Sequence, residues 1–392
     1  MENQHNTFRG VFLVIILFHA LIHFAGFARA FDLERASIII QNISKIFGIF
    51  WLTGGLLFIV SALLFYLKKN VWMFFSITAI SLSQYLIMAY WPETKLATVI
   101  NVIILFGTIL AVAEWNFSKK YKKQVQAFLR QQPVAPVDLL TEIDIQHLPV
   151  LVKKYLKYTG SVGKPKVKNF KINFFGRLRQ DEQSEWMLFT SQQYNFVDAS
   201  TRLFFLNATM KHLPVSGFHS FKNGKAFMDI RLFSMFRVQY QSGKEMNISE
   251  TVTFFNDMCC LAPATLIDAR IQWMETDGNK VRATFTNNNI TVGAWLHFNE
   301  DGELINFISE DRYAADSKKM KRIPWSTPLQ DYKNLNGYRL ASYADAMYHY
   351  SNRSFTYGNF YVESVEYNCN EKKSLYSFQA PTAKHQLNFC EI

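Results

Sequence analysis

The sequence predicts a membrane-embedded, all-α region of four helices, followed by an α+β domain dominated by a curved antiparallel β-sheet. Three observations lead to this prediction. Four long uncharged apolar runs lie within the first 115 residues, the rest of the chain is polar and interrupted by turn residues, and the excess positive charge falls between these two parts. The mean hydropathy of the whole chain, -0.02, hides this division.

The four apolar runs contain no Lys, Arg, Asp or Glu and cover residues 10–28, Ile46–Leu67, Asn70–Pro92 and Leu96–Ala113. At about 1.5 Å of rise per residue, each run is long enough to cross a hydrocarbon core of about 30 Å as a helix. We therefore expect a four-helix transmembrane region over residues 1–117. The segment Ala28-Arg29-Ala30 also fits a signal-peptide cleavage site, but only Arg9 precedes the first run and three more runs follow it.

The basic residues around these runs predict the orientation of the chain. Seven Lys and Arg residues flank the runs on the side of the N-terminus, and four lie on the opposite side. Because cytoplasmic loops are enriched in Lys and Arg, we expect a multi-pass protein of the cell (inner) membrane with its C-terminal domain in the cytoplasm. Removal of the first run as a signal peptide would not change this expectation, because the end of the fourth run would still face the cytoplasm.

The positive charge is concentrated just after the fourth run. The net charge is +11, and residues 118–180 contain 14 basic and 3 acidic side chains. A basic band beside a membrane is attracted to anionic lipids by about 1 kcal/mol per residue near the surface. We therefore expect the anionic lipids of the cytoplasmic leaflet as a partner of residues 118–180, with a merely solvated face as the alternative. No nucleic-acid recognition motif accompanies the band.

The elements after the membrane region begin with helices. A basic helix and linker over residues 118–137 ends at the Pro133–Pro136 break, and a short helix follows over residues 147–160, which ends at Gly160. Alternating apolar residues then predict strands, beginning with a hairpin whose turn is Gln180–Ser184 and continuing over residues 203–210, 215–221, 225–232 and 236–241. Asn223-Gly224 is a strong signal for a two-residue hairpin turn.

A helix interrupts this series of strands. Asn247 and Glu250 resemble a capping box that opens a helix through Cys260, and Pro263 ends it. Strands resume over residues 269–275, 280–286, 290–298 and 303–313. Consecutive strands with short turns imply antiparallel pairing in one β-rich domain over residues 138–370, followed by a tail over residues 371–392. The high aromatic content requires either a thick core or a sheet that encloses an apolar cavity.

Several kinds of chemistry lack their sequence signatures. The four cysteines, Cys259, Cys260, Cys369 and Cys390, show neither a CxxC nor a zinc-ligand spacing, so we expect no disulfide, no metal and no cofactor. The glycine, serine and histidine motifs of nucleotide-binding, hydrolase and metalloprotease sites are also missing. Glu310-Asp311-Arg312 fits a catalytic acid pair, but alternation along a strand favours an edge-strand salt bridge between Glu310 and Arg312. These absences favour a protein that is not an enzyme, with a membrane enzyme as the alternative.

A resemblance to a known family rests on motifs spread over most of the chain. They are LPVLVKKYLKYTGSVGKPKV, FFGRLR, EWMLFTSQQYNF, LFFLNATM, RATF, NEDGELINF, DRY, IPW and NGYRLAS, with LIHFAGFARAF and SQYLIMAYWPETK in the membrane region. Together they resemble a bacterial domain-of-unknown-function family. The family's W-x-x-F-x-x-x-Q-x-Y strand corresponds here to Trp186, Phe189, Gln193 (or Gln192) and Tyr194. The resemblance covers residues 10 to about 367 and implies no activity; the soluble part is also similar in fold to lipoprotein-carrier domains.

His19 and His23 lie four residues apart, which places both rings on one face of the first helix. The other three runs contain no histidine, so one chain cannot hold a haem between two histidines of different helices. Hydrogen bonds to Gln84, Asn101 or a backbone carbonyl inside the bundle would explain both rings structurally. Because polar groups inside membranes are often functional, a polar head group of a quinone or lipid is the alternative ligand.

These observations give three hypotheses. The first is that the β-rich domain binds a lipid or another apolar small molecule. The second is a membrane redox or quinone-interacting protein that uses His19 and His23, and the third is a membrane-anchored protein-interaction or sensor module. Trp186 and Trp325 fit either the core or a ligand platform. The candidate ligand-binding residues are His19, His23, Gln84, Asn101, Trp186, Gln193, Tyr194, Arg312 and Trp325.

Overall fold

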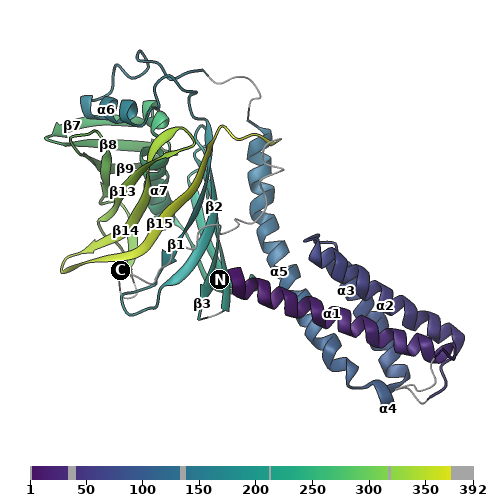
Figure 1. The fold of residues 1–392 in the computed structure, drawn as a ribbon. Coiled ribbons are helices and arrows are strands. Elements are labelled where there is room, and N and C mark those ends of the chain that lie inside the picture. The colour runs from purple at the N-terminus through teal and green to yellow at the C-terminus, as the bar shows by residue number, and fades with distance from the viewer. Residues whose placement is uncertain (1, 34–40, 133–137, 212, 317–318, 372–392) are drawn as a thin grey trace. The chain divides into compact units, whose positions relative to one another are not determined.

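The computed structural model describes residues 2–33, 41–132, 138–211, 213–316 and 319–371 (Figure 1). They form two compact units, which meet in the sequence between Phe117 and Ser118. The predicted fold class is confirmed, because four long apolar helices come first and a large antiparallel sheet with one long helix follows. The predicted tail lies outside the described residues, apart from Glu371.

The first unit contains α1 (Glu2–Ala30), α2 (Lys45–Tyr66), α3 (Trp72–Ala89), the short α4 (Trp91–Thr94) and the first part of α5 (Ala97–Arg130). Four of these helices are long and apolar enough to cross a membrane, which suggests a multi-pass membrane protein. Large apolar side chains such as Val14, Leu21, Leu63 and Phe74 are 55–64% exposed. Such a surface suits hydrocarbon, since each helix satisfies its own backbone hydrogen bonds there.

The second unit begins with the rest of α5 and with α6 (Val150–Tyr158), and then forms two sheets. The strands are β1 (Asn169–Leu178), β2 (Met187–Phe196), β3 (Thr201–Met210), β4 (Leu213–Lys222), β5 (Lys225–Leu232), β6 (Phe236–Ser242), β7 (Ile271–Asp277), β8 (Lys280–Asn287), β9 (Ile290–Phe298), β10 (Leu304–Ser309), β11 (Tyr313–Asp316), β12 (Lys319–Arg322), β13 (Trp325–Leu335), β14 (Tyr338–Tyr350) and β15 (Arg353–Tyr367). Between β6 and β7 lie α7 (Lys244–Leu261) and the 3-10 helix η1 (Pro263–Ile267).

Thirteen of these strands form one antiparallel sheet, in the order β6-β5-β4-β3-β2-β1-β15-β14-β13-β10-β9-β8-β7. β11 and β12 form a separate hairpin. Most neighbours in the large sheet are also neighbours in sequence, as the short turns predict. The pairing of β1 with β15 is different, because it joins Phe170 to Tyr367 near the two ends of the domain. β15 therefore links six strands on one side of the sheet to six on the other.

α7 lies against the inner face of this sheet. Fifteen of its 18 residues are buried, so the helix is covered on every side. It contacts strands as far apart in the sheet as β6 and β9, which shows that the sheet curves around it (Figure 1). Aromatic rings fill the space between them: Phe255 stacks on Phe285 with ring centroids 5.4 Å apart and meets Phe307 edge-on at 5.5 Å.

The C-terminal part of α5 covers the opposite face of β2, β3 and β4. Tyr121 stacks on Phe205 at 5.4 Å and donates a hydrogen bond to the carbonyl oxygen of Gln192 over 3.1 Å. Further along α5, Phe128 stacks on Phe196 with ring centroids 5.1 Å apart. The strands β2, β3 and β4 therefore have α7 on one face and α5 on the other. This explains why apolar side chains point from both faces of these strands.

Several predicted details are wrong. α7 begins at Lys244, three residues before the expected capping box, and Gly243 occupies the position before its first residue. Asn247 instead accepts a hydrogen bond from the backbone N–H of Ala226 over 2.7 Å. The strand expected over residues 303–313 ends at Ser309, and β13, β14 and β15 were not predicted. The predicted Pro133–Pro136 break lies outside the described residues.

Candidate functional site

A cluster of five polar side chains lies between α7 and strands β2 and β3, and we call it the α7 network. Arg202 donates from Nε to Asp257 Oδ2 over 2.9 Å, from Nη1 to Glu250 Oε2 over 3.1 Å and from Nη2 to Gln193 Oε1 over 2.8 Å. Gln193 Nε2 and Asn195 Nδ2 also donate to Asp257 Oδ2, over 2.8 and 3.0 Å. One arginine therefore ties two strands to α7.

The local structure explains why these residues meet. Gln193 and Asn195 are two apart on β2 and so point to the same face of the sheet. Arg202 lies directly opposite Asn195 in the β2–β3 register. Glu250 and Asp257 are seven apart on α7, which is about two helical turns, so both carboxylates face the same strands.

The α7 network is almost completely shielded from water. Its five side chains belong to residues that are at most 8% exposed. Burial raises the pKa of Asp257, although Arg202 and Asn195 oppose this effect. Beside the network, burial lowers the pKa of His219 to about 4, with Glu250 acting in the opposite direction. Buried charges with shifted pKa values occur both at functional sites and in structural ion pairs, so the network can clamp α7 or hold a charged ligand group.

Arg312 and Trp325 form a second polar contact with α7. The Arg312 guanidinium lies 4.5 Å from the centroid of the Trp325 ring. Its Nε donates to the Tyr348 hydroxyl over 3.0 Å, and its Nη1 donates to the Thr253 hydroxyl on α7. The sequence interpretation of an edge-strand pair between Arg312 and Glu310 is wrong, because the chain leaves the strand after Ser309 and Arg312 turns toward α7.

The other candidates of the β-rich domain lie apart from the α7 network. Trp186 precedes β2, and its ring is contacted by the guanidinium groups of Arg177 and Arg179 at 4.6 and 4.4 Å from the centroid. Tyr194 points to the face of β2 opposite to Gln193 and stacks on Phe196 at 6.2 Å. In the W-x-x-F-x-x-x-Q-x-Y motif, Gln193 therefore points toward α7, and Tyr194 points to the face of β2 that α5 covers.

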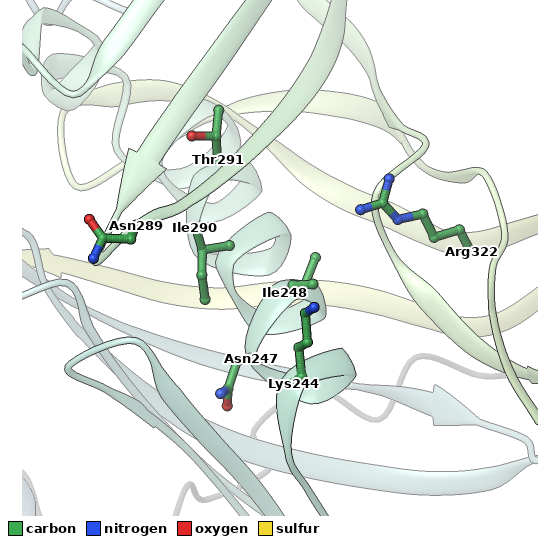
Figure 2. Close-up of a pocket in the computed structure, with 7 residues that line it drawn as sticks. All are labelled: Lys244, Asn247, Ile248, Asn289, Ile290, Thr291 and Arg322. Carbon is green, nitrogen blue, oxygen red and sulfur yellow. The ribbon is translucent and has the colours of Figure 1, made fainter.

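A cleft of about 340 Å³ opens at the start of α7 (Figure 2). It is lined by Lys244, Asn247 and Ile248 from α7, by Asn289, Ile290 and Thr291 from the turn into β9, and by Arg322 from β12. Ile248 belongs to the core and Ile290 packs against it, so the floor of the cleft is apolar. Lys244 and Arg322 are exposed and give it a positive rim. A space of this size with mixed lining is in the usual range for a small-molecule site.

His19 and His23 lie inside the first unit, where His19 hydrogen-bonds to two other helices and His23 to the backbone of α1. His19 Nε2 is 2.8 Å from Asn101 Oδ1 on α5 and 3.2 Å from Ser83 Oγ on α3. His23 Nδ1 is 2.9 Å from the carbonyl oxygen of His19. Asn101 Nδ2 donates to Gln84 Oε1 over 3.2 Å, so the structure brings four of the candidate residues together.

Three polar atoms in the same region have no hydrogen-bond partner within the described part of the chain. They are His19 Nδ1, His23 Nε2 and Trp51 Nε1, on side chains that are at most 1% exposed. Each such atom costs about 1–3 kcal/mol. The rings fit because of two glycines: a Cβ on Gly26 would lie 2.3 Å from Trp51 Cδ2, and one on Gly54 would lie 2.9 Å from His23 Cδ2.

Sequence reasoning missed Trp51 and most of the α7 network. Glu250 was assigned to a helix cap, although a second acid, Asp257, follows seven residues later on the same face of the predicted helix. Arg202, which directly precedes LFFLNATM, was not among the predicted site residues.

The described residues contain no group of three or more His, Cys, Asp or Glu side chains arranged to hold a metal ion. Cys259, Cys260 and Cys369 are buried, and Cys390 lies outside the described residues. Burial raises the pKa of the Cys259 and Cys260 thiols well above the usual value, which makes both poor nucleophiles.

The solved structures to which the chain is distantly similar include two proteins of uncharacterised families. A DUF1329 family protein from Desulfovibrio piger has 8% sequence identity and a TM-score of 0.32, with 56% of this chain and 92% of that chain covered. A beta-barrel-like protein of the domain of unknown function DUF1849 from Brucella abortus has 8% identity and a TM-score of 0.21, with 52% and 99% covered. No curated protein matches the chain.

A family match agrees with the resemblance noted in the soluble part of the sequence. It covers residues 138–360, which is more than half of the chain and excludes the four apolar helices. The chain therefore belongs to DUF6544, a family of unknown function.

Proposed function

We propose that this DUF6544 protein is anchored in the cell membrane by four helices and uses a cytoplasmic β-rich domain to bind a lipid or another apolar ligand. The four candidate spans support the anchor. The seven-to-four distribution of basic residues across the runs supports the cytoplasmic side.

The observation that carries the proposal is the cleft at the start of α7. An apolar floor with Ile248 and Ile290 below a rim with Lys244 and Arg322 suits an amphiphile that has an acyl chain and an anionic head group. Burying the acyl chain of the ligand would contribute roughly 25 cal/mol of binding free energy per Å² of apolar area. Arg322 already pairs with Asp311 over 3.3 Å, so Lys244 is the stronger attraction for an anion.

The basic band of residues 118–180 supports contact with an anionic leaflet, but fewer of its charges are available than the sequence suggests. Lys166 pairs with Asp144 over 2.8 Å, and Lys171 pairs with Glu366 over 2.9 Å. Lys120, in contrast, is exposed on α5. We therefore expect α5, rather than the whole band, to contribute most of the attraction to anionic lipids.

The test is lipid analysis of the full chain. The protein is purified in mild detergent, its bound lipids are identified by native mass spectrometry, and binding of a fluorescent fatty acid is measured. Lys244→Glu should weaken binding of the anionic probe at least fivefold, and Ile248→Arg should abolish it by filling the cleft with a charge. Lys333→Glu is the control, because Lys333 is exposed on β13 and does not line the cleft.

Two results would contradict lipid binding. One is the absence of saturable binding by the unmodified protein, and the other is an equal effect of Lys244→Glu and Lys333→Glu. If a protein then co-purifies stoichiometrically with the intact chain, the interaction-module hypothesis replaces the lipid-binding one.

A further inference from the structure

We propose that the helices of the first unit bind the head group of a hydroquinone-type amphiphile at His19, His23 and Trp51. This site is independent of the cleft in the β-rich domain. Each of these three rings has one polar atom without a hydrogen-bond partner among the described residues, and the hydrogens on the rings define which ligand groups those atoms can bind.

The partners of the histidines fix the position of each ring hydrogen. Asn101 Oδ1 is an amide oxygen and only accepts hydrogen bonds, so His19 Nε2 donates to it and His19 Nδ1 presents a lone pair. The carbonyl oxygen of His19 also only accepts, so His23 Nδ1 donates to it and His23 Nε2 presents a lone pair. Neither lone pair has a partner within the described residues. The bundle thus offers two unused acceptors.

Trp51 adds an unused donor beside them. Its indole N–H has no acceptor in the part of the chain that the structure describes. The Trp51 ring lies 5.2 Å from the His23 ring, and the His23 ring lies 4.9 Å from the His19 ring, measured between centroids. Phe58 closes the cluster, 4.8 Å from His19 and 5.4 Å from His23. Three unsatisfied groups are therefore carried by adjoining aromatic rings.

The ligand must complement two acceptors and one donor in apolar surroundings. A hydroquinone has hydroxyl hydrogens to donate to the imidazole nitrogens, hydroxyl oxygen to accept from the indole N–H, and a flat apolar ring. An oxidised quinone has carbonyl oxygens and no hydroxyl hydrogen, so it can satisfy Trp51 but neither histidine. The site should therefore prefer the reduced form.

The depth of the site suits a head group with a membrane-embedded tail. His23 is seven residues before the end of α1 at Ala30, and Trp51 is six residues after the start of α2 at Lys45. At 1.5 Å per residue, both lie about 10 Å from the helix ends. A head group can reach this depth from the interfacial region while its tail stays in the hydrocarbon.

The experiment measures binding of a short-chain hydroquinone and of its oxidised quinone to the full chain in phosphatidylcholine nanodiscs, by native mass spectrometry. Nitrogen-15 NMR of labelled histidines follows the ring nitrogens. We expect one hydroquinone per chain, at least tenfold weaker binding of the quinone, and a change in the His23 Nε2 resonance on binding. Trp51→Phe, which removes the donor but keeps an aromatic ring, should weaken binding five- to tenfold.

Trp72→Phe is the matched control, because Trp72 is also buried in the first unit but its ring packs against Phe12 and Phe65. Equal effects of the two tryptophan variants would overturn the proposal, as would equal binding of both redox forms. Binding of diacylglycerol that excludes the hydroquinone would show that the head-group class is wrong. If neither compound binds and His23→Leu raises the melting temperature, the unpartnered atoms carry no ligand site.

Discussion

Replacing Arg202 with methionine should destabilise the second unit more than any single surface change. Methionine retains much of the volume of the arginine stem but removes the charge that Asp257 and Glu250 share. Both carboxylates would then remain buried without the cation that bridges them. A buried ion pair broken on one side leaves an uncompensated charge, which is costlier than losing both partners.

The structure sets the size of the effect. Arg202 donates three hydrogen bonds over 2.8–3.1 Å, two of them to carboxylates, and is 8% exposed. Removal of one member of such a network costs about 3–5 kcal/mol. The triple variant Arg202→Met, Glu250→Gln, Asp257→Asn should recover more than half of this loss, because no buried charge remains in the network.

The assay is urea denaturation of the full chain in detergent, followed by far-ultraviolet circular dichroism of the sheet. Burial raises the pKa of Asp257 and Arg202 opposes this effect, so the pKa of Asp257 should rise further in the Arg202→Met variant. The Asp257 carboxyl of the variant therefore favours folding below its unfolded pKa of about 4 and loses this contribution as the pH rises. The deficit should therefore be largest at neutral pH and smallest near pH 4.

The matched control is Arg237→Met. Arg237 pairs with Asp229 over 3.1 Å, but its side chain is 51% exposed and Asp229 keeps Arg231 as a partner. We expect a loss below about 1 kcal/mol for this variant. The reasoning would be refuted if Arg202→Met lost no more stability than Arg237→Met, or if its loss of stability did not change with pH.

Three further predictions test other parts of the molecule. Burial lowers the pKa of His219 to about 4. The stability that its neutral form contributes should be complete above pH 6.5 and should fall by at most about 3 kcal/mol as the pH drops through 4. In urea titrations, His219→Phe should remove this pH dependence. Gly26→Ala would place a Cβ 2.3 Å from Trp51 and should destabilise the helices by about 1–3 kcal/mol in thermal unfolding. A Cβ on Gly10 would have no atom within 4 Å, so Gly10→Ala should leave the stability unchanged. A reporter that is active only outside the cytoplasm should stay silent when fused after Ile392, and strong activity would reverse the proposed orientation.

The sequence predicted the helices well because hydrocarbon leaves few alternatives for a long uncharged run. It also located the hairpin turn at Asn223-Gly224, where both residues adopt positive φ angles of 51° and 69°. The same signal at Asn336-Gly337, with φ angles of 52° and 84°, joins β13 to β14 but was not used. Neither strand shows a clean alternation of buried and exposed residues, because β13 runs from a buried start to an exposed end and β14 has long half-exposed stretches. Their polar content therefore concealed them.

The candidate sites were harder to predict because their parts come from distant segments. Arg202 and Asp257 are 55 residues apart, and nothing local in either segment indicates that they meet. His19 and His23 were found because histidine is conspicuous in an apolar run. Trp51 resembles any other aromatic residue of a membrane helix, and only the packing of α1 against α2 gives its N–H a special environment.

The position of β15 between β1 and β14 has a consequence for biosynthesis. The strands β1 to β6 are complete once residue 242 has been made, but the partner that covers the free edge of β1 ends at residue 367. At about 5–20 residues per second, the ribosome needs roughly 6–25 s to add the intervening 125 residues. During this time the half-finished sheet has an open edge, which makes it a natural client for chaperones. A premature stop before Arg353 would leave two half-sheets with no strand to join them, so C-terminal truncations should aggregate rather than yield a smaller folded domain.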